Sequence, residues 1–441
     1  TYGKLLKFTF PSMVMMILTS IYGVVDGVFI SNFIGAEPFA AINIVMPFLM
    51  IFGAVGFMLG TGGSALVAYT LGTGNHQKAN KIFSLLVYVL IVAGLLFTVL
   101  GELFLAPISG LLGADASMLP YCIQYGRIIL VALVPFMLQN VFQSLLVTAE
   151  RPQLGLYITI IAGVTNVILD ALFIAVFKLG VPGAAAATVI GQCVAAIVAF
   201  TCNHKFNHDV KLHFRGFRPS AKIIGTIYAI GVPSIIMQSI GSVMTYSMNR
   251  ILIEFSSTAT AVFGVYFKLQ SFFFMPLFGL NNGITPIIAY NYGARNRKRM
   301  VKTIRLSLIT AFCLTFIGFL CFEGIPQILL GMFNASEDML TIGIPALRII
   351  GIHYLLAWFC IVSGTVFQAL GKAVFSMIVS IMRQLVVLIP AAYILSKLGG
   401  LHVVWWSFPI AEIVSLVVSL LFLLRINRTV ISKIPDGSDI L

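Results

Sequence analysis

Two aspartates, Asp26 and Asp170, lie inside stretches of the sequence that are otherwise apolar. An ionised carboxylate at the centre of a membrane helix costs roughly 2.5 to 3.5 kcal/mol on insertion scales. A chain that carries two such groups is therefore expected to use them, and binding of a proton or a metal cation is a common use of carboxylates inside a membrane. The two residues are candidates for an ion or proton site.

The helices that must hold these aspartates place them at one depth. Asp26 lies about seven residues before the end of an apolar run over 5–33, and Asp170 lies about six before the end of a run over 153–176. At a rise of ~1.5 Å per residue, both side chains come about 10 Å below the same membrane surface. They can therefore share one site.

Two more polar residues fall near this level. Thr188 lies about seven residues into the next apolar run, over 181–201. Asn166 precedes Asp170 by four residues, which puts it on the same helix face one turn deeper. Two carboxylates, an amide and a hydroxyl suit a hard cation such as Na+, or a proton held between the carboxylates. The alternative is that both aspartates only hydrogen-bond to neighbouring backbone.

Composition defines the class of protein. Of 441 residues, 59% are hydrophobic and 9% are charged, against roughly 25% charged in an average soluble domain. Apolar runs of about 20 residues recur along the whole length, which indicates an integral membrane protein without a sizeable extramembrane domain. The six cysteines show no CxxC spacing, and no GxxxxGK[ST] loop occurs. We therefore expect no enzyme activity, no direct use of ATP and no cofactor other than a coupling ion.

The apolar runs predict an all-α protein with twelve transmembrane helices, over residues 5–33, 39–70, 79–101, 118–148, 153–176, 181–201, 221–254, 258–290, 300–322, 338–369, 373–396 and 400–425. Twenty lysines and arginines fall in the connections on one side, and only Lys178 and Lys397 fall on the other. This asymmetry predicts that both termini lie in the cytoplasm. We expect the protein in the plasma (inner) membrane of the cell. The same asymmetry explains the net charge of +13 without nucleic-acid binding.

The sequence repeats itself around residue 221. Most matching pairs share an offset of 221 residues, and the pairs are Phe10-Pro11-Ser12 with Val232-Pro233-Ser234, Ala68-Tyr69 with Ala289-Tyr290, Leu71-Gly72 with Tyr292-Gly293, Asn75 with Asn296, Lys81 with Lys302, Arg127-Ile128-Ile129 with Arg348-Ile349-Ile350, and Phe142-Gln143 with Phe367-Gln368. Six spans per repeat imply two parallel bundles related by a pseudo-two-fold axis along the membrane normal, with a substrate cleft between them. The expected domains are 1–201, a cytoplasmic linker 202–220, 221–426, and a cytoplasmic tail 427–441.

The residues that carry this reading also resemble a known family. Pro11 with Asp26, the run Asn166-Val-Ile-Leu-Asp170 and the run Gly183-Ala-Ala-Ala-Ala-Thr188 are similar to the multidrug and toxic compound extrusion (MATE) transporters, over essentially the whole chain. The resemblance is closer to the bacterial and archaeal DinF-like branch than to the NorM branch, because Gly241 stands where the latter has a glutamate. It implies antiport of bulky, often cationic drugs against H+ or Na+ by alternating access, with Asp26, Asn166, Asp170 and Thr188 as the ion site.

The second half has a different set of polar residues. Lys268, Arg383 and Glu412 each lie about ten to twelve residues from a helix end, near the bilayer midplane. Two interpretations have equal weight: Glu412 is a carboxylate for substrate or protons gated by the two cations, or the three form an ion network that fixes packing. In the first half, Pro11 weakens its helix and gives it a place to bend.

Other functions remain to be weighed. A flippase for a lipid-linked saccharide is the alternative transporter, but twelve spans and two aspartates favour drug export. A major-facilitator carrier would have an Asp-Arg-rich loop that is absent between Leu71 and Lys81. A receptor or scaffold would leave the buried aspartates unexplained. We expect a monomer whose partners are small organic molecules and the lipid bilayer.

Overall fold

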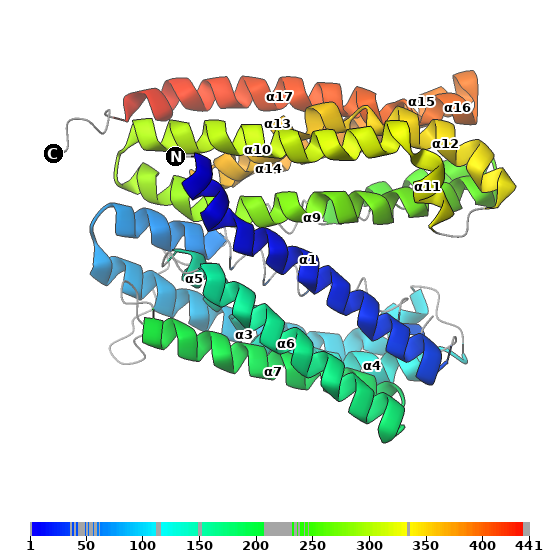
Figure 1. Ribbon diagram of the computed structural model, residues 1–441, viewed down its shortest axis with the longest axis horizontal. Coiled ribbons are helices and arrows are strands. Elements are labelled where there is room, and N and C mark those ends of the chain that lie inside the picture. The colour runs from blue at the N-terminus through cyan, green and yellow to red at the C-terminus, as the bar shows by residue number, and fades with distance from the viewer. Residues whose placement is uncertain are drawn as a thin grey trace. The chain divides into compact units, whose positions relative to one another are not determined.

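The computed structural model describes residues 2–35, 38, 41–42, 49, 52, 56, 60, 62–111, 116–148, 152–206, 232, 236, 239–241, 243–245, 247–332 and 336–434. Within these residues the regular structure is helical throughout (Figure 1). The predicted spans 39–70 and 221–254 lie largely outside the described residues, as does the predicted linker from position 207 onward.

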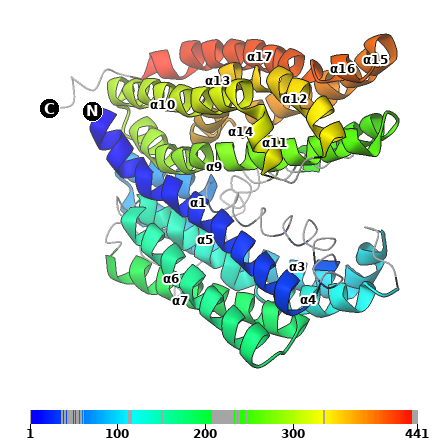
Figure 2. The ribbon, with the colours of Figure 1, turned by 45° about the vertical axis from the view of Figure 1, so that its right-hand side comes forward.

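The chain divides into two compact units, one made of Leu6–Gly231 and one made of Thr1–Leu5 with Val232–Leu441. The described helices of the first are α1 (Tyr2–Phe33), α3 (His76–Leu111), α4 (Leu119–Val131), α5 (Leu133–Thr148), α6 (Pro152–Asp170), its π-helical continuation η1 (Ala171–Val176), and α7 (Val181–Phe206). Helices α6 and α7 run side by side (Figures 1 and 2). This packing brings the residues predicted for the ion site onto adjacent helices.

The helices described in the second unit are α9 (Ser257–Gly293), α10 (Arg297–Gly324), α11 (Pro326–Gly331), α12 (Glu337–Gly351), α13 (Tyr354–Ala369), α14 (Ala373–Ile381), the π-helical η2 (Met382–Leu388), α15 (Ile389–Gly399), α16 (Leu401–Val404), α17 (Ser407–Thr429) and the 3-10 turn η3 (Ile431–Lys433). Its centre is aromatic: Phe263, Tyr266, Phe322 and Tyr354 are fully buried and make ring contacts with one another or with shared neighbours. A polar cluster described below is enclosed by these rings.

The described helices account for up to ten of the twelve predicted spans. Eight are long and apolar enough to cross a membrane, and ten spans result when each of two bent helix pairs counts as one. Three details of the prediction were wrong. The run over 118–148 is bent by 48° between α4 and α5, and the run over 338–369 is bent by 51° between α12 and α13. Helix α3 also continues past Gly101 to Leu111, because that glycine allows close packing against Leu130 instead of ending the helix.

The internal repeat is visible in two matching loops. Gly74 and Arg295, 221 residues apart, both have positive φ angles, of 86° and 55°. The side-chain oxygen of the next residue, Asn75 or Asn296, accepts a hydrogen bond from the backbone N–H three residues on, at 3.1 and 3.2 Å. Each asparagine thereby caps the N-terminus of its helix, α3 or α10. The two loops are therefore the same structure built twice.

Candidate functional site

Asp26 on α1 and Asp170 at the end of α6 face each other in the first unit. Their carboxyl groups lie within hydrogen-bonding reach of each other. Asp170 is only 1% exposed. Oδ1 of Asp26 and both side-chain oxygens of Asp170 are buried and find no hydrogen-bond donor among the described residues. Because two ionised carboxylates have no hydrogen to share, this pair is completed only when a proton or a small cation lies between them.

Tyr125 on α4 belongs to the same site, although the sequence-based prediction did not include it. Its side chain is buried, hydrogen-bonds with Thr188 and lies close enough to Asp26 and Asp170 to sense both charges. Thr188 Oγ1 donates to the carbonyl oxygen of Ala184 at 3.2 Å and lies within hydrogen-bonding reach of the Tyr125 side chain. A tyrosine in an apolar helix carries one polar atom that needs a partner, and this was the available signal.

Asn166 lies on α6 one turn before Asp170, as predicted. It packs against α7 at Gly191, where an added Cβ would lie 3.4 Å from the Asn166 Cβ. The Asn166 Oδ1 atom is buried and finds no hydrogen-bond donor within the described part of the chain. The structure thus adds an unpaired carbonyl oxygen on the helix face that carries Asp170.

A close helix contact sets the spacing between α1 and α6. The ring of Tyr22 occupies the space that a Cβ on Gly163 would need. Asp26 follows Tyr22 by one helical turn, and Asp170 follows Gly163 by two turns along α6. The glycine therefore lets the Tyr22 ring of α1 pack against the backbone of α6, on the side from which both helices continue to their aspartates. Helix α1 itself continues through the buried Pro11 as one helix.

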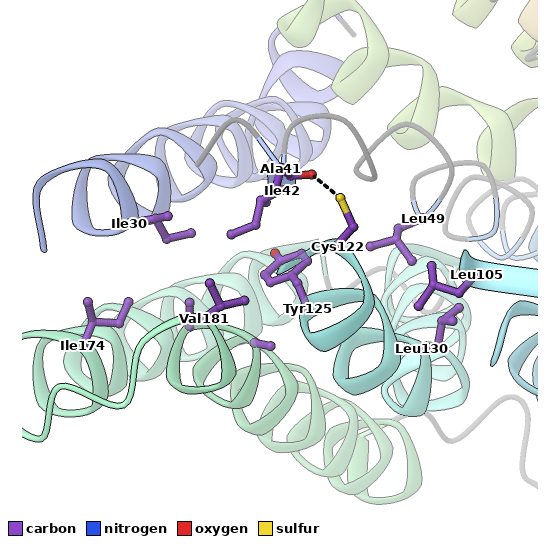
Figure 3. Close-up of a cluster of buried hydrophobic side chains, with 12 residues drawn as sticks. Ile30, Ala41, Ile42, Leu49, Leu105, Cys122, Tyr125, Leu130, Ile174 and Val181 are labelled. Carbon is purple, nitrogen blue, oxygen red and sulfur yellow. Dashed lines mark hydrogen bonds between the residues drawn. The ribbon is translucent and has the colours of Figure 1, made fainter. Parts of the chain in front are cut away.

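An apolar cluster lies beyond the carboxylates, toward the end of α1 (Figure 3). Ile30 is one turn beyond Asp26, and Ile174 is one turn beyond Asp170. The other buried members are Ala41, Ile42, Leu49, Leu105, Cys122, Tyr125, Leu130, Val181, Ala184 and Ala185. Cys122 Sγ donates to the carbonyl oxygen of Ala41 at 3.1 Å, which ties α4 into this layer. Packed apolar side chains thus separate the two aspartates from that end of the bundle.

In the second unit, two of the three predicted midplane charges meet. Arg383 Nη1 lies 3.9 Å from Glu412 Oε2, and Glu412 is 4% exposed. Lys268 is exposed on α9, between the buried residues Tyr266 and Leu269. Among the described residues, Glu412 lies within ion-pair distance of Arg383 and of a histidine, His353, which is charged only when protonated.

The sequence-based prediction missed His353, which lies in the short break between α12 and α13. Its Nδ1 atom is 3.7 Å from Glu412 Oε2, and its Nε2 atom is 2.7 Å from the hydroxyl oxygen of Tyr266. The signal was present: a histidine inside an apolar run of membrane length is a polar residue at a costly depth.

The donor atoms suit a proton or a weakly held cation. Within the described residues, no group of three or more His, Cys, Asp or Glu side chains is placed to hold a metal ion. A cation at the Asp26 and Asp170 pair would therefore complete its shell with neutral oxygens, such as those of Asn166, Thr188 and water.

Comparison with known proteins gives two kinds of relatives. "Multidrug export protein MepA" of Staphylococcus haemolyticus (strain JCSC1435) is 26% identical over 98% of this chain and 95% of its own length. The protein of the same name from Staphylococcus aureus (strain MSSA476) is 25% identical over 99% and 97%. Crystal structures described as MATE in the straight and in the bent conformation both superpose with a TM-score of 0.90, at 24% and 23% identity. They cover 98% and 97% of this chain, and 97% and 96% of their own.

The structural comparisons establish the fold, which in MATE transporters consists of twelve membrane helices in two bundles. The family model MatE matches this chain twice, over residues 11–172 and 233–394. One match falls in each half of the internal repeat, and together they cover most of the chain. The chain is therefore a member of the MatE family of membrane transporters.

Proposed function

We propose that this chain exports amphipathic, often cationic organic compounds in exchange for H+ or Na+ by alternating access. Three facts support the proposal: membership of the MatE family, full-length relatives that carry the name multidrug export protein, and helices that cross a membrane along the length of the chain. These relatives do not favour the alternative of a saccharide flippase.

The observation that carries the proposal is the facing pair of carboxyl groups, Asp26 and Asp170. Two buried acids that share one site can hold a proton or a cation and can release it, which changes the charge inside the bundle by one unit. A ligand shifts a conformational equilibrium only by its different affinity for the two states, and a change of buried charge provides such a difference. Tyr125 and Thr188 would stabilise the loaded form.

The apolar cluster suggests the direction from which this site is closed. The positive-inside pattern places the end of α1 on the outer side, so Ile30 and Ile174 would lie between the aspartates and the outside. In this arrangement the pair exchanges ions with the outside only after the cluster opens. Both termini would then be cytoplasmic, in the plasma membrane of a cell in which the protein acts as a monomer.

The carboxyl pair also supports placement in the DinF-like branch. In this proposal the coupling ion binds in the first unit, where the four predicted residues lie with Tyr125. Gly241, at the position matched to the NorM-branch glutamate, provides no side-chain ligand in the second unit. Na+ requires more oxygen ligands than a proton does, and Asn166 and Thr188 are the candidates to supply them.

The test is efflux from proteoliposomes that contain the full chain. A fluorescent amphipathic cation is loaded, and a Na+ gradient and a proton gradient are imposed separately, each with the membrane potential clamped. We expect one of the two gradients to drive efflux, and this efflux should be lost in Asp26→Asn and Asp170→Asn. Glu102→Gln, which alters a carboxylate paired with Arg127 outside the site, is the matched control. Efflux that responds to neither gradient would exclude ion-coupled export.

A further inference from the structure

We propose that the second unit carries its own proton-binding site, formed by Tyr266, His353, Arg383 and Glu412 at the break between α12 and α13. The proposal deepens the proposed function in one respect only: the second proton would take part in the same transport cycle. Binding of the proton itself does not depend on Asp26 and Asp170, because all four residues lie within the unit that contains Val232–Leu441.

The four side chains form a continuous polar row in an apolar environment. Tyr266 hydrogen-bonds to Nε2 of His353 at 2.7 Å, and Nδ1 of His353 points to Glu412 Oε2 at 3.7 Å. That second distance is too long for a hydrogen bond. His353 Nδ1 and Glu412 Oε1 are both buried and find no hydrogen-bond partner among the described residues. One hydrogen bond is therefore missing from the row, the one between the imidazole of His353 and the carboxyl group of Glu412.

Glu412 has two possible cationic partners, Arg383 and His353, and is within hydrogen-bonding distance of neither. Arg383 Nη1 lies 3.9 Å from the same Oε2 atom, which is also beyond hydrogen-bonding distance. A pair with Arg383 is neutral without any added proton. A pair with His353 becomes charge-assisted only when the imidazole has accepted a proton from water, because both of its nitrogens are then donors. The proton thus bridges Nδ1 and Oε2, and its release to water restores the first pair.

Arg383 is less enclosed than its partner Glu412. Its side chain is 28% exposed, whereas the Glu412 side chain is 5% exposed. Arg383 lies in the π-helical segment η2, which packs against α17, the helix that carries Glu412. A π-helical turn is a strained form of helix that often occurs at functional sites. Arg383 is therefore the less enclosed member of the pair and the one with room to move away from Glu412.

The groups that face Glu412 come from each neighbouring element. Arg383 of η2 is the charged neighbour, Cys360 of α13 lies within hydrogen-bonding reach, and Tyr266 of α9 senses the Glu412 charge. The rest of the enclosure is aromatic, with Phe274, Phe408 and Tyr354 in ring contact with His353. Among the charges of α10 and α12, Glu323 and Arg348 interact with each other. This enclosure keeps the added proton between the two groups that bind it.

The position of the row connects the proton to the shape of the unit. His353 stands where α12 and α13 meet at 51°, and its backbone N–H donates to Ile350 at 3.0 Å. If Glu412 forms a hydrogen bond with His353, the imidazole moves toward α17 and the angle between α12 and α13 changes. Because packed helix pairs have discrete arrangements, a local bond of this kind can select one of two shapes.

The test is a direct measurement of proton binding by the full chain in lipid. Infrared difference spectra are recorded between acidic and alkaline buffer, and proton uptake is counted with a pH indicator over the same interval. In wild type, the carboxyl bands should change between the two buffers, and Glu412→Gln should remove this change. The variant should also take up about one proton fewer per molecule than wild type. The same change should persist in the double variant Asp26→Asn/Asp170→Asn. Glu102→Gln is the control and should leave the band in place.

Each other outcome is decisive. A Glu412→Gln protein that retains the band and the full proton uptake overturns the proposal and leaves a fixed ion network. If Glu412→Gln does not fold, His353→Gln is measured instead, because glutamine preserves a neutral partner for Tyr266; undiminished uptake in that variant likewise overturns the proposal. Failure of the proposed export function appears separately, as a lack of ion-driven efflux in wild type with the infrared change intact.

Discussion

Ala132 and His353 occupy the same position in the two sequence repeats, 221 residues apart, and each marks the bend of its helix. The backbone N–H of each donates to the carbonyl three residues earlier, at 3.0 Å in both repeats. The carbonyl of each accepts from the N–H four residues later, at 3.0 and 2.9 Å. The two bends therefore share these backbone hydrogen bonds, and the first forms without a histidine, beside Pro135, which has no counterpart in the second unit.

This relationship separates what the two units share from what distinguishes them. The bend, the capped loops and the overall helix order are common to both. The aspartate pair is confined to the first unit: at the offsets of 221 to 225 seen in the repeat, Asp26 corresponds to Ser247 or Met248, and Asp170 to Ala391 or Leu395. Conversely, Glu412 corresponds to Gly191 or Ala187, and Arg383 to Ala162 or Ile158, none of which is charged. Each unit has thus placed a different buried polar cluster on the same scaffold.

The first prediction concerns the aspartate pair. Asp26→Asn and Asp170→Asn should each abolish ion-coupled efflux, because an amide keeps the shape of the side chain but loses the charge that binds the ion. Expression and thermal stability should remain largely intact, since the amide can donate to the remaining carboxylate. Vesicle efflux and thermal unfolding of the purified protein are the two measurements. Wild-type efflux by both variants would remove these residues from the ion site.

The second prediction tests how the site is positioned. Gly163→Ala introduces a Cβ into the space filled by the Tyr22 ring, so the ring has to leave this contact with α6. We expect a loss of about 1–3 kcal/mol in the free energy of unfolding, as for other overpacked contacts, together with a large loss of coupled efflux. The double variant Gly163→Ala/Tyr22→Ala should recover part of both. Full efflux by Gly163→Ala alone would show that this contact does not set the spacing of the aspartates.

The sequence predicted much of the fold because burial in a membrane leaves strong signals. Apolar length indicated the spans, and the offset of 221 indicated the repeat that two tandem MatE matches now confirm. Depth alone brought Asp26 and Asp170 to the same level, since a regular helix converts residue number into distance. That these positions bind the coupling ion stays a prediction.

The sequence did not reveal features that depend on side-chain direction or on local backbone. Tyr125 and His353 were missed because each is a single polar residue in an apolar run, and only the packed helices show what it faces. Pro135, three residues after Ala132, signalled the first bend, whereas no proline stands at the matching place after His353. Lys268 was grouped with Glu412 by depth, yet depth does not tell which face of α9 a residue occupies.

The third prediction concerns the ion pair of the second unit. Arg383→Gln removes the charged neighbour of Glu412, and breaking a buried pair in this way typically costs about 3–5 kcal/mol. We expect the lower end of this range, because the Arg383 side chain is partly exposed. The double variant Arg383→Gln/Glu412→Gln should be more stable than Arg383→Gln, since no buried charge is left alone. Thermal unfolding measures both, and a double variant no more stable than the single one would contradict the pairing.

The fourth prediction uses the two capped loops as a matched pair. Gly74→Ala should lower the free energy of unfolding by about 1–2 kcal/mol, because an L side chain is disfavoured at positive φ. No atom lies within 4 Å of the added Cβ, so crowding does not contribute. At the matching position, Arg295→Gly should raise stability, by up to about 1 kcal/mol. Changes of the same sign at both positions would show that backbone conformation is not what limits these loops.

The last prediction joins α1 to the ion site. Pro11 cannot donate a backbone hydrogen bond, so α1 is weakened about four turns before Asp26. Loading of Asp26 with a proton or cation would change which partners the end of α1 prefers and could bend the helix at this point.

Spin labels at Val14 on α1 and Ile161 on α6 report the movement within one unit. During titration with pH and with Na+, the label distances should change in wild type and stay fixed in Asp26→Asn. Pro11→Ala should restore the missing hydrogen-bond donor and reduce the movement while leaving ion binding in place. Equal movement in wild type and Asp26→Asn would mean that Asp26 does not drive the change, and α1 would then be a rigid support for the site.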